Sequence, residues 1–351
     1  MPKVLIADRM SALAAEVFAA RGVEADVKTG LAPEELKAVI AEYDGLAVRS
    51  ATKATAEIIQ AADNLKVIGR AGIGVDNIDL DAATERGIVV MNTPFGNSIT
   101  TAEHAIAMMA ALARQIPLAD RSTRAGKWEK SRFMGIELCK KELGIIGCGN
   151  IGAIVATLAL GLKMRVLVYD PYLSPERANA LQVERMELDE LLARADIISL
   201  HVPATPETRG ILDAAALAKT KPGVFIVNCA RGGLVVEKDL KAAIESGHVA
   251  GAALDVFATE PARDNPLFEL DQVIATPHLG ASTEEAQENV ARQVAEQMSD
   301  FLLDGGVTNA VNTPSVAAED LAQLAPYMRL AEQLGSFAGQ LTESGLVGAT
   351  I

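Results

Sequence analysis

Three short stretches in the second half of the chain carry side chains that could do acid–base chemistry on a small acid. Arg231 in "VNCARGG", Glu260 in "LDVFATEP" and His278 in "IATPHLGAST" each follow an apolar run typical of a strand. A histidine with a carboxylate partner can exchange a proton with an alcohol, and an arginine can bind a carboxylate through two parallel hydrogen bonds. Because the carboxyl ends of strands line the ligand crevice of an open α/β sheet, we expect these side chains to converge.

The stretch "LGIIGCGNIG" has the spacing of a dinucleotide-binding turn between a strand and a helix. Gly147 permits the tight turn, Gly149 lets the backbone approach a pyrophosphate, and Gly152 allows close packing of the helix, whose N-terminus supplies N–H donors. Asp170 ends the next strand pattern, 18 residues after Gly152. A carboxylate there would accept hydrogen bonds from ribose hydroxyls and repel a 2′-phosphate, so the pattern predicts NAD rather than NADP.

Strand-like apolar runs alternate with helical patterns in two series, one before residue 98 and one from residue 141 to residue 278. This alternation predicts an α/β protein with two Rossmann-like domains, each a parallel sheet wrapped by helices. Two long helical patterns, 98–127 and 283–303, connect the series, and Pro117 predicts either two helices or one interrupted helix in the first of them.

The composition excludes several classes of partner. With 351 residues, half of them apolar, the chain can bury the cores of two domains. A net charge of −14 gives little support for binding nucleic acid or an anionic membrane. The three cysteines, Cys139, Cys148 and Cys229, lack the spacing of a zinc site, so we expect no metal and a reducing cytoplasmic location. No apolar segment approaches the roughly 18 residues of a transmembrane helix.

The stretches "LGIIGCGNIG", "VNCARGGLVVE", "ALDVFATEP" and "TPHLGAST" occur in the order found in the D-2-hydroxyacid dehydrogenase family, which the chain resembles from Lys3 to about Asn312. The resemblance implies that Arg231 binds the substrate carboxylate and carbonyl oxygen, that His278 is the general acid/base and that Glu260 orients His278. The implied reaction transfers a hydride from C2 of a D-hydroxy acid to the nicotinamide of NAD, while neutral His278 removes the hydroxyl proton.

The resemblance also implies a set of cofactor contacts around the glycine motif. Asp255 would face the nicotinamide carboxamide, and Cys229 is expected to be a small wall residue rather than a nucleophile. The implied cofactor-binding residues are Gly147, Gly149, Asn150, Ile151, Gly152, Asp170, Val202, Cys229, Ala230, Asp255, Gly280 and Ala281.

The N-terminal stretches "VRSATK" and "VIGRAGIGVDNIDL" resemble the branch of that family that oxidises D-3-phosphoglycerate to 3-phosphohydroxypyruvate, the first step of serine biosynthesis. A phosphorylated substrate needs positive charge beyond Arg231, which Arg49 and Arg70 could supply, and the backbone N–H groups of a "GIG" turn could bind its carboxylate. The expected substrate-binding residues are Arg49, Ser50, Arg70, Ile73, Gly74, Arg231 and His278.

With this resemblance, the second connector is expected to carry the chain back to the first domain. An NAD-binding domain of residues 98–283 is then inserted into a discontinuous substrate-binding domain of residues 1–97 and 284–312, with a cleft between them. Residues 313–351 resemble the start of a further domain that breaks off, so a serine-sensing regulatory domain would be absent. The resemblance further implies a homodimer or homotetramer.

Two other functions stay open at this point. The chain could be a glyoxylate/hydroxypyruvate reductase or a D-lactate dehydrogenase of the same family, although Arg49 and Arg70 favour a phosphorylated substrate. It could also be an NAD-sensing protein without activity, similar to the corepressors related to these enzymes, because a fold alone does not fix a function.

Overall fold

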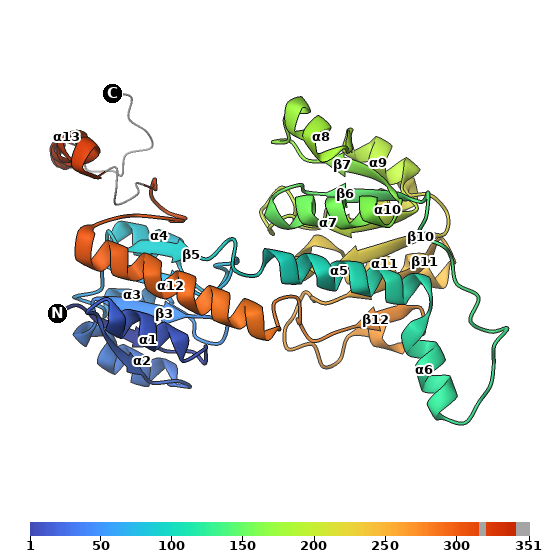
Figure 1. The fold of residues 1–351 in the computed structure, drawn as a ribbon, viewed down its shortest axis with the longest axis horizontal. Coiled ribbons are helices and arrows are strands. Elements are labelled where there is room, and N and C mark those ends of the chain that lie inside the picture. Colours follow the sequence, from blue (N-terminus) through green and yellow to red (C-terminus); the bar gives the residue numbers. More distant parts are fainter. Residues whose placement is uncertain (316–320, 342–351) are drawn as a thin grey trace. The chain divides into compact units, whose positions relative to one another are not determined.

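The computed structural model describes residues 1–315 and 321–341, and the chain divides into two compact units (Figure 1). Unit 1 comprises Met1–Pro94 and the described residues from Glu288 on, and unit 2 comprises Phe95–Gln287. The chain therefore leaves unit 1 once and returns to it once. The boundaries expected after residues 97 and 283 lie within a few residues of these divisions.

Unit 1 contains a five-stranded sheet in which every pair of neighbours is parallel, in the order β2-β1-β3-β4-β5. Its strands are β1 (Lys3–Ile6), β2 (Glu24–Val27), β3 (Gly45–Val48), β4 (Val67–Arg70) and β5 (Val89–Asn92). Its helical segments are α1 (Leu13–Ala20), α2 (Pro33–Val39), η1 (Ile40–Glu42), α3 (Ala56–Gln60), α4 (Leu80–Glu85), most of α12 (Glu284–Asp304) and α13 (Leu321–Leu341).

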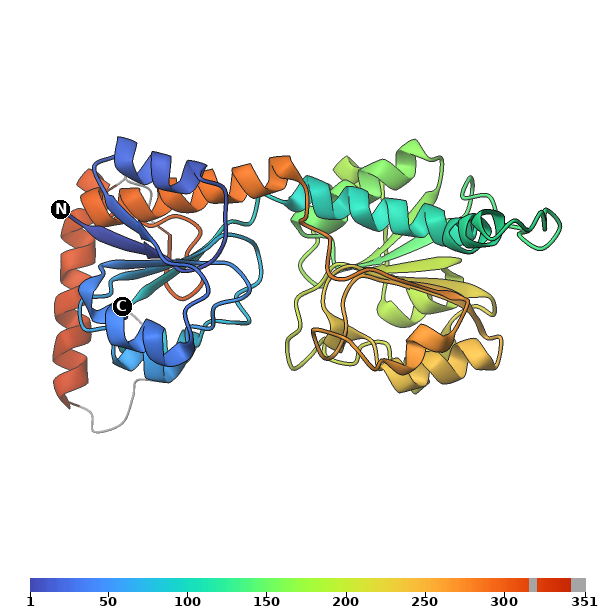
Figure 2. The ribbon, with the colours of Figure 1, turned by 90° about the horizontal axis from the view of Figure 1, so that it is seen from below.

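Helices cover both faces of this sheet (Figure 2). Phe18 of α1 and Met298 of α12 belong to the core on one face, and Ile58 of α3 belongs to the core on the other. Helix α12 lies so close to the sheet that a Cβ atom on Gly69 of β4 would overlap Met298. The small residue in the strand thus permits the packing of a helix that is distant in sequence.

Unit 2 contains a seven-stranded parallel sheet in the order β12-β11-β10-β9-β6-β7-β8. Its strands are β6 (Glu142–Ile146), β7 (Arg165–Tyr169), β8 (Glu184–Arg185), β9 (Ile197–Leu200), β10 (Val224–Asn228), β11 (Val249–Leu254) and β12 (Val273–Ala275). Its helical segments are α5 (Ser98–Ala113), α6 (Ile116–Arg124), α7 (Asn150–Gly161), α8 (Pro175–Leu181), α9 (Leu188–Arg194), α10 (Ala214–Lys219), η2 (Gly232–Leu234), α11 (Glu237–Glu245) and η3 (Pro266–Glu269).

The apolar strands of unit 2 are buried between two helical layers, as Figure 2 shows. Helices α5, α7 and α8 contribute to the core on one face, and α9, α10 and α11 contribute to the core on the other. The prediction of two parallel-sheet α/β domains is therefore confirmed. Residues 98–127 form two helices, and Pro117 lies in the first turn of α6, where its missing N–H costs no hydrogen bond.

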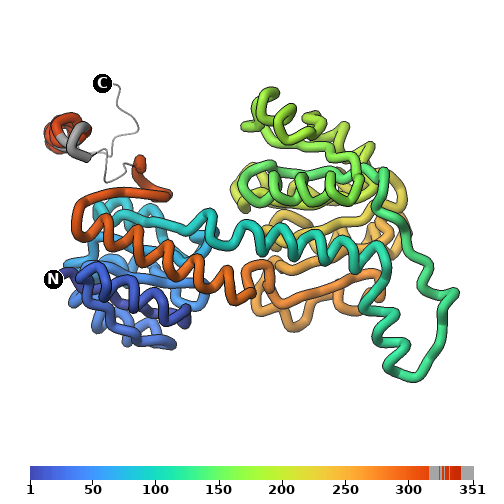
Figure 3. Tube along the Cα trace, viewed as in Figure 1, coloured from blue at the N-terminus to red at the C-terminus, as the bar shows by residue number. Residues whose placement is uncertain are grey.

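After α6 the chain runs through a long segment without helix or strand before β6 begins (Figure 3). Trp128 in this segment has 87% of its surface exposed. Residues 313–351, expected to start a further domain, are described only in part: α13 lies within them, and residues 316–320 and 342–351 lie outside the described residues. Among the residues that are described, no helix combines the length and the apolarity needed to cross a membrane.

Candidate active site

All strands of the unit 2 sheet are parallel, so the loops that follow them leave from one edge. The register pairs Asn228 with Leu254 and Leu254 with Ala275, so that β10, β11 and β12 end side by side. Arg231 and His278 each lie three residues beyond the last residue of their strand. The structure therefore brings the loops of the three predicted acid–base residues to the same edge as the glycine motif that follows β6.

The glycine motif forms a turn that only glycine can complete at two of its three positions. Gly147 has a φ of +92°, and a Cβ atom on it would overlap Val202. A Cβ atom on Gly152 would overlap the carbonyl oxygen of Gly147. A Cβ atom on Gly149 would meet no protein atom within 4 Å. Gly149 caps α7, so its open side leaves room for a ligand to approach the amide groups at the helix N-terminus.

Asp170 lies directly after β7 and is joined to the glycine turn. Its Oδ2 atom accepts a hydrogen bond from the backbone N–H of Cys148 at 2.7 Å, and its Oδ1 atom accepts one from Tyr172 at 2.8 Å. Burial, with a contribution from the Asp170 charge, raises the pKa of the Cys148 thiol. The fixed carboxylate beside a turn with one open glycine fits the ribose and pyrophosphate of a dinucleotide.

The other side of the turn is formed by the residues that follow β9. The imidazole of His201 hydrogen-bonds with the Ser199 hydroxyl at 2.8 Å, and burial lowers the pKa of His201 to about 4. The ring is therefore neutral at pH 7. Its backbone oxygen and Val202 both lie where a Cβ atom of Gly147 would be, so this segment fixes the shape of the turn.

His278 and Glu260 form a hydrogen-bonded pair. Nδ1 of His278 lies 2.7 Å from Oε2 of Glu260, and Oε1 of Glu260 accepts the Phe257 N–H at 3.0 Å. Burial would raise the pKa of Glu260, but these hydrogen bonds outweigh it and the pKa lies below its usual value. Because a carboxylate only accepts, Nδ1 carries the proton, and Nε2 of the neutral ring is left as an acceptor.

The backbone of His278 is in the left-handed region, with a φ of +57°, which is rare for a residue other than glycine. Its N–H donates to the carbonyl oxygen of Asp255 at 2.9 Å and to that of Thr276 at 3.0 Å. The side chain is 49% exposed. These bonds hold the residue in a strained conformation with its ring accessible at the sheet edge, as is common at functional sites.

Asp255 is fully buried and holds the loop that contains His278. Its Oδ1 atom accepts from the Thr276 hydroxyl at 2.6 Å and from the Leu279 N–H at 2.7 Å, and Oδ2 accepts from the Gly280 N–H at 2.8 Å. Nε2 of His104 lies 3.3 Å from Oδ1. Burial would raise the pKa of Asp255, but these donors outweigh it and the pKa lies below its usual value. The expected contact with the nicotinamide carboxamide stays a prediction, because both oxygens here face protein donors.

Arg231 extends from a tight loop after β10. One guanidinium nitrogen donates to the Ala230 carbonyl oxygen at 2.7 Å, and the Arg231 carbonyl oxygen accepts from the Asn228 amide at 2.8 Å. A Cβ atom on Gly232 would overlap the carbonyl group of Phe257, so the loop after β10 lies directly against the loop that contains Glu260. Burial raises the pKa of Cys229, which is therefore a neutral thiol.

The remaining predicted cofactor residues lie in the same loops. Asn150 and Ile151 are the first two residues of α7, and Ala230 donates its N–H to Asn228 Oδ1 at 3.1 Å. The carbonyl oxygen of Ala281 accepts from the side chain of Gln287 at 2.9 Å. All of these residues lie at the carboxyl edge of the unit 2 sheet.

In unit 1, the predicted substrate-binding residues also gather at the carboxyl edge of the sheet. Arg70 ends β4 opposite Val48 of β3, the residue before Arg49. Buried Asp8 accepts the N–H groups of Arg49 and Thr52 at 2.6 and 3.0 Å and so fixes their loop. Burial lowers the pKa of Arg49. Arg49 directly after β3 and Arg70 at the end of β4 thus lie at the ends of neighbouring strands, and Ser50 is exposed.

The "GIG" turn follows β4 at the same edge. The Ile73 carbonyl oxygen accepts from the Asn92 side chain at 2.7 Å, and Gly72 donates its N–H to the Thr93 hydroxyl at 2.6 Å. Gly74 follows directly. These bonds hold the turn against the end of β5, so its backbone is ordered in advance of any ligand.

Several residues that shape the site were not predicted. Gly232 and Glu237 lie within the quoted stretch "VNCARGGLVVE". The sequence indicates Gly232 only as part of a double glycine, and Glu237 only as an acidic residue after an apolar run. Asp8, His104 and Thr276 carry no such signal, because their partners are distant in the sequence.

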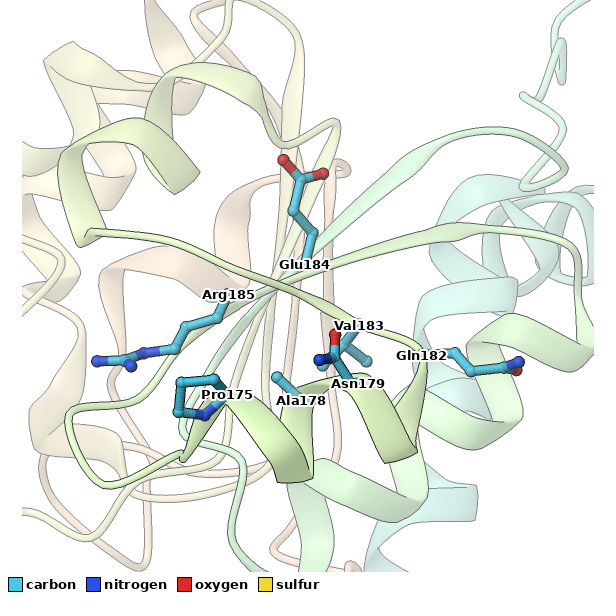
Figure 4. Close-up of a pocket in the computed structure, with 7 residues that line it drawn as sticks. All are labelled: Pro175, Ala178, Asn179, Gln182, Val183, Glu184 and Arg185. Carbon is cyan, nitrogen blue, oxygen red and sulfur yellow. The ribbon is translucent and has the colours of Figure 1, made fainter.

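A hollow of about 670 Å³ lies elsewhere in unit 2, at the edge of the sheet formed by α8 and β8 (Figure 4). It contains none of the predicted site residues; its lining consists of Pro175, Ala178, Asn179, Gln182, Val183, Glu184 and Arg185. In the described part of the chain, histidine, cysteine and carboxylate side chains form no group of three that could hold a metal ion.

Known proteins resemble the chain along nearly its whole length. Residues 106–280 match the model of the D-isomer specific 2-hydroxyacid dehydrogenase, NAD binding domain. The D-3-phosphoglycerate dehydrogenase of Synechocystis sp. is 50% identical over 341 residues, which cover 97% of this chain and 61% of that protein. The D-3-phosphoglycerate dehydrogenase of Archaeoglobus fulgidus is 51% identical over 96% of this chain and 64% of its own length. The chain thus spans less than two thirds of these relatives.

Solved structures also resemble the chain. The TT0316 protein from Thermus thermophilus is 35% identical, with a TM-score of 0.81 over 88% of this chain and 99% of that one.

Proposed function

Since the chain belongs to the D-isomer-specific 2-hydroxyacid dehydrogenase family, we propose that it oxidises D-3-phosphoglycerate to 3-phosphohydroxypyruvate with NAD, the first step of serine biosynthesis. The observation that carries the chemistry is the 2.7 Å hydrogen bond between His278 and Glu260, at the sheet edge that also carries Arg231. The choice of substrate is supported by the curated relatives at about half identity and by the two arginines at the carboxyl edge of the unit 1 sheet.

His278 is the general base in this proposal. Nε2 of the neutral ring takes the proton of the C2 hydroxyl group as the C2–H bond breaks. Glu260 accepts a hydrogen bond from the Nδ1–H group throughout the reaction, and its charge stabilises the imidazolium that forms. In the reverse direction, the imidazolium returns the proton to the carbonyl oxygen. The pair therefore lets His278 serve as base in one direction and as acid in the other.

Arg231 binds and orients the substrate. Its guanidinium group can bind the carboxylate through two N–H donors, and a third donor can reach the oxygen on C2. As the alcohol becomes a carbonyl group, a hydrogen-bond donor at this oxygen keeps C2 positioned for hydride transfer. The loop position of Arg231 is fixed by the Asn228 hydrogen bond.

NAD would be held by the open side of Gly149, the N–H groups at the start of α7 and the carboxylate of Asp170. When bound, it supplies the acceptor for the hydride. Asp170 would favour NAD over NADP, because a 2′-phosphate would be repelled by its charge.

The proposal assigns recognition of the phosphate group to Arg49 and Arg70. The substrate is an anion and the chain has a net charge of −14, so binding must rely on a local concentration of positive charge. Arg49 has a backbone held by Asp8, which limits the loss of entropy when a ligand binds.

The test is the initial rate of NADH formation with D-3-phosphoglycerate, D-glycerate and D-lactate, at raised pH or with the product trapped. Arg49→Ala and Arg70→Ala should raise KM for the phosphorylated acid by about tenfold or more each, since each removes a charge-assisted hydrogen bond. Lys66→Ala is the matched control, because Lys66 precedes the first residue of β4 and pairs with Asp44 at 2.9 Å.

Phosphoglycerate would be refuted as the substrate if the unphosphorylated acids were turned over equally well and if Arg49→Ala and Arg70→Ala left KM unchanged. That outcome would favour a reductase of small keto acids. The glyoxylate reductase from Paecilomyes thermophila, 30% identical with a TM-score of 0.82 over 88% of this chain and 98% of that one, makes this the second candidate.

We further propose that the chain forms a homodimer or homotetramer in the cytoplasm. The support is that the segment after α6 exposes two large apolar side chains, Trp128 at 87% and Met134 at 78%. Light scattering at micromolar concentration should give a dimer or tetramer, and Trp128→Glu should shift it to a smaller species. A monomeric wild type would refute this proposal.

A further inference from the structure

We propose that Glu237 is a positioning residue for the Glu260–His278 pair, acting through the backbone of the loop between β11 and η3. The inference rests on the proposed function, in which that pair moves the proton. Glu237 is the first residue of α11, and its carboxylate accepts hydrogen bonds from the loop rather than from either member of the pair.

Glu237 holds the loop at two points. Its Oε1 atom accepts the backbone N–H of Ala258 at 2.7 Å, and its Oε2 atom accepts the side-chain amide of Asn265 at 2.8 Å. The orientation of that amide is fixed, because Oδ1 of Asn265 accepts the N–H of Leu267 at 3.0 Å. Glu237 must therefore accept at both oxygens, which a carboxylate can do and a glutamine cannot.

Two consecutive backbone amides connect Glu237 with Glu260. Phe257 donates its N–H to Glu260, and Ala258 donates its N–H to Glu237. The two N–H groups belong to adjacent rigid peptide planes that share the Cα atom of Phe257, so a shift of one plane reaches the other through the φ and ψ angles of that residue. The Glu237–Ala258 hydrogen bond therefore restrains the backbone that presents the Phe257 N–H to Glu260, and its loss would loosen that backbone.

The same segment is confined from two other sides. The backbone of Gly232 lies directly against the Phe257 carbonyl group, and the Phe257 ring packs edge to face on Phe268 at 5.2 Å between centroids. The Glu260 side chain is 37% exposed, so packing restrains it less than it restrains Phe257. Its position relative to His278 thus depends on the loop backbone, for which Glu237 provides the two hydrogen bonds from the neighbouring helix.

The experiment compares Glu237→Ala, Glu237→Gln, Glu260→Gln and the double variant Glu237→Ala/Glu260→Gln. Glu237→Ala should lower kcat by about tenfold or more, because small displacements of reacting groups are costly, while the Kd for NAD stays within about twofold. It should also move the pH profile of kcat/KM in the direction that Glu260→Gln does. In the Glu260→Gln background the same change should have little further effect on kcat, since Glu237 acts through Glu260.

Glu237→Gln keeps an acceptor for Ala258 but presents a donor to Asn265, so its effect should lie between those of wild type and Glu237→Ala. Glu245→Ala is the matched control, because Glu245 ends the same helix and faces Lys241 at 3.9 Å. A kcat unchanged in Glu237→Ala, or losses that multiply in the double variant, would overturn the inference and leave Glu237 a purely structural residue.

A second readout does not depend on the substrate. In protein labelled with ¹⁵N-histidine, the Nδ1 proton of His278 should resonate far downfield in the wild type and move upfield in both Glu260→Gln and Glu237→Ala. If D-3-phosphoglycerate is not oxidised but this shift occurs, the proposed function fails and the positioning role stands. If the signal does not move in Glu237→Ala, the positioning role fails. Should Glu237→Ala not fold, Glu237→Gln is judged by the same signal.

Discussion

Gly152 faces the carbonyl oxygen of Gly147 so closely that a Cβ atom on Gly152 would overlap it. The glycine turn is thus closed on itself at one side, where helix α7 meets the end of β6. Its middle member, Gly149, has no protein atom within 4 Å of where its Cβ would lie. The three glycines therefore serve two different purposes, and substitution separates them.

Gly152→Ala should lower the free energy of unfolding by about 1–3 kcal/mol, because the methyl group has to displace backbone. Gly149→Ala should leave that free energy nearly unchanged and weaken NAD binding, since the methyl group occupies the space of the ligand. Urea unfolding and titration of NAD by protein fluorescence measure the two effects. Equal losses of stability in both variants would contradict this division.

His278→Gln should lower kcat by about 10²–10⁴-fold, because the general base is lost, with the Kd for NAD unchanged. The control is His248→Gln, since His248 precedes β11 at the opposite edge of the sheet and contacts Thr220 at 3.0 Å. Stopped-flow rates of NADH formation give the result. An NAD-sensing protein without activity would show no turnover to lose, even in the wild type.

Asp170→Asn should raise the ratio of kcat/KM for NADP to that for NAD by about tenfold or more, because the charge that repels a 2′-phosphate is removed. The amide oxygen can still accept from Cys148, so the glycine turn keeps its hydrogen bond, while the bond from the Tyr172 N–H is lost. Asp189→Asn, on α9 and paired with Lys219, is a surface control. An unchanged ratio would mean that Asp170 serves the turn alone.

The pKa of His201, lowered to about 4 by burial, makes stability depend on pH. Between about pH 6.5 and 4, the unfolded chain binds a proton at this residue and the folded chain does not, so the contribution of His201 to the unfolding free energy falls as the pH falls. The loss is at most about 1.4 kcal/mol per pH unit. Urea unfolding should be measured for wild type and His201→Gln at pH 7, 6 and 5. As the pH falls, the unfolding free energy of the wild type should decrease relative to that of His201→Gln. A difference independent of pH would contradict the assignment.

Much of this arrangement could be predicted from the sequence because it depends on local patterns. The apolar strands of both sheets are recognisable by composition, and the residues that follow them lie at the carboxyl edge as a result. Strand β2, with the sequence "EADV", is not recognisable in this way, since an edge strand that is half exposed needs no apolar run. Strand β8 is two exposed charged residues and carries no signal at all.

The parts of the site that could not be predicted depend on contacts across long separations. The contact of Asp255 with the cofactor stays a prediction, and the sequence did not indicate its four protein donors, which come from the loop after β12 and, in His104, from α5. Nothing in the local sequence tells which atoms satisfy a buried carboxylate. The role of Gly232 is equally hidden, because the backbone that excludes a side chain there belongs to another loop.

The discontinuity of unit 1 has a consequence for the order in which the chain is made. Val90 of β5 donates its N–H to Asn312, 222 residues later, and Ala310 pairs with Met91. During translation, every strand of unit 2 is synthesised before Met298 and Asn312, so the part of the unit 1 sheet that α12 covers stays unpacked until after the strands of unit 2 have been made. That apolar surface stays exposed to solvent until α12 has emerged and packed on it.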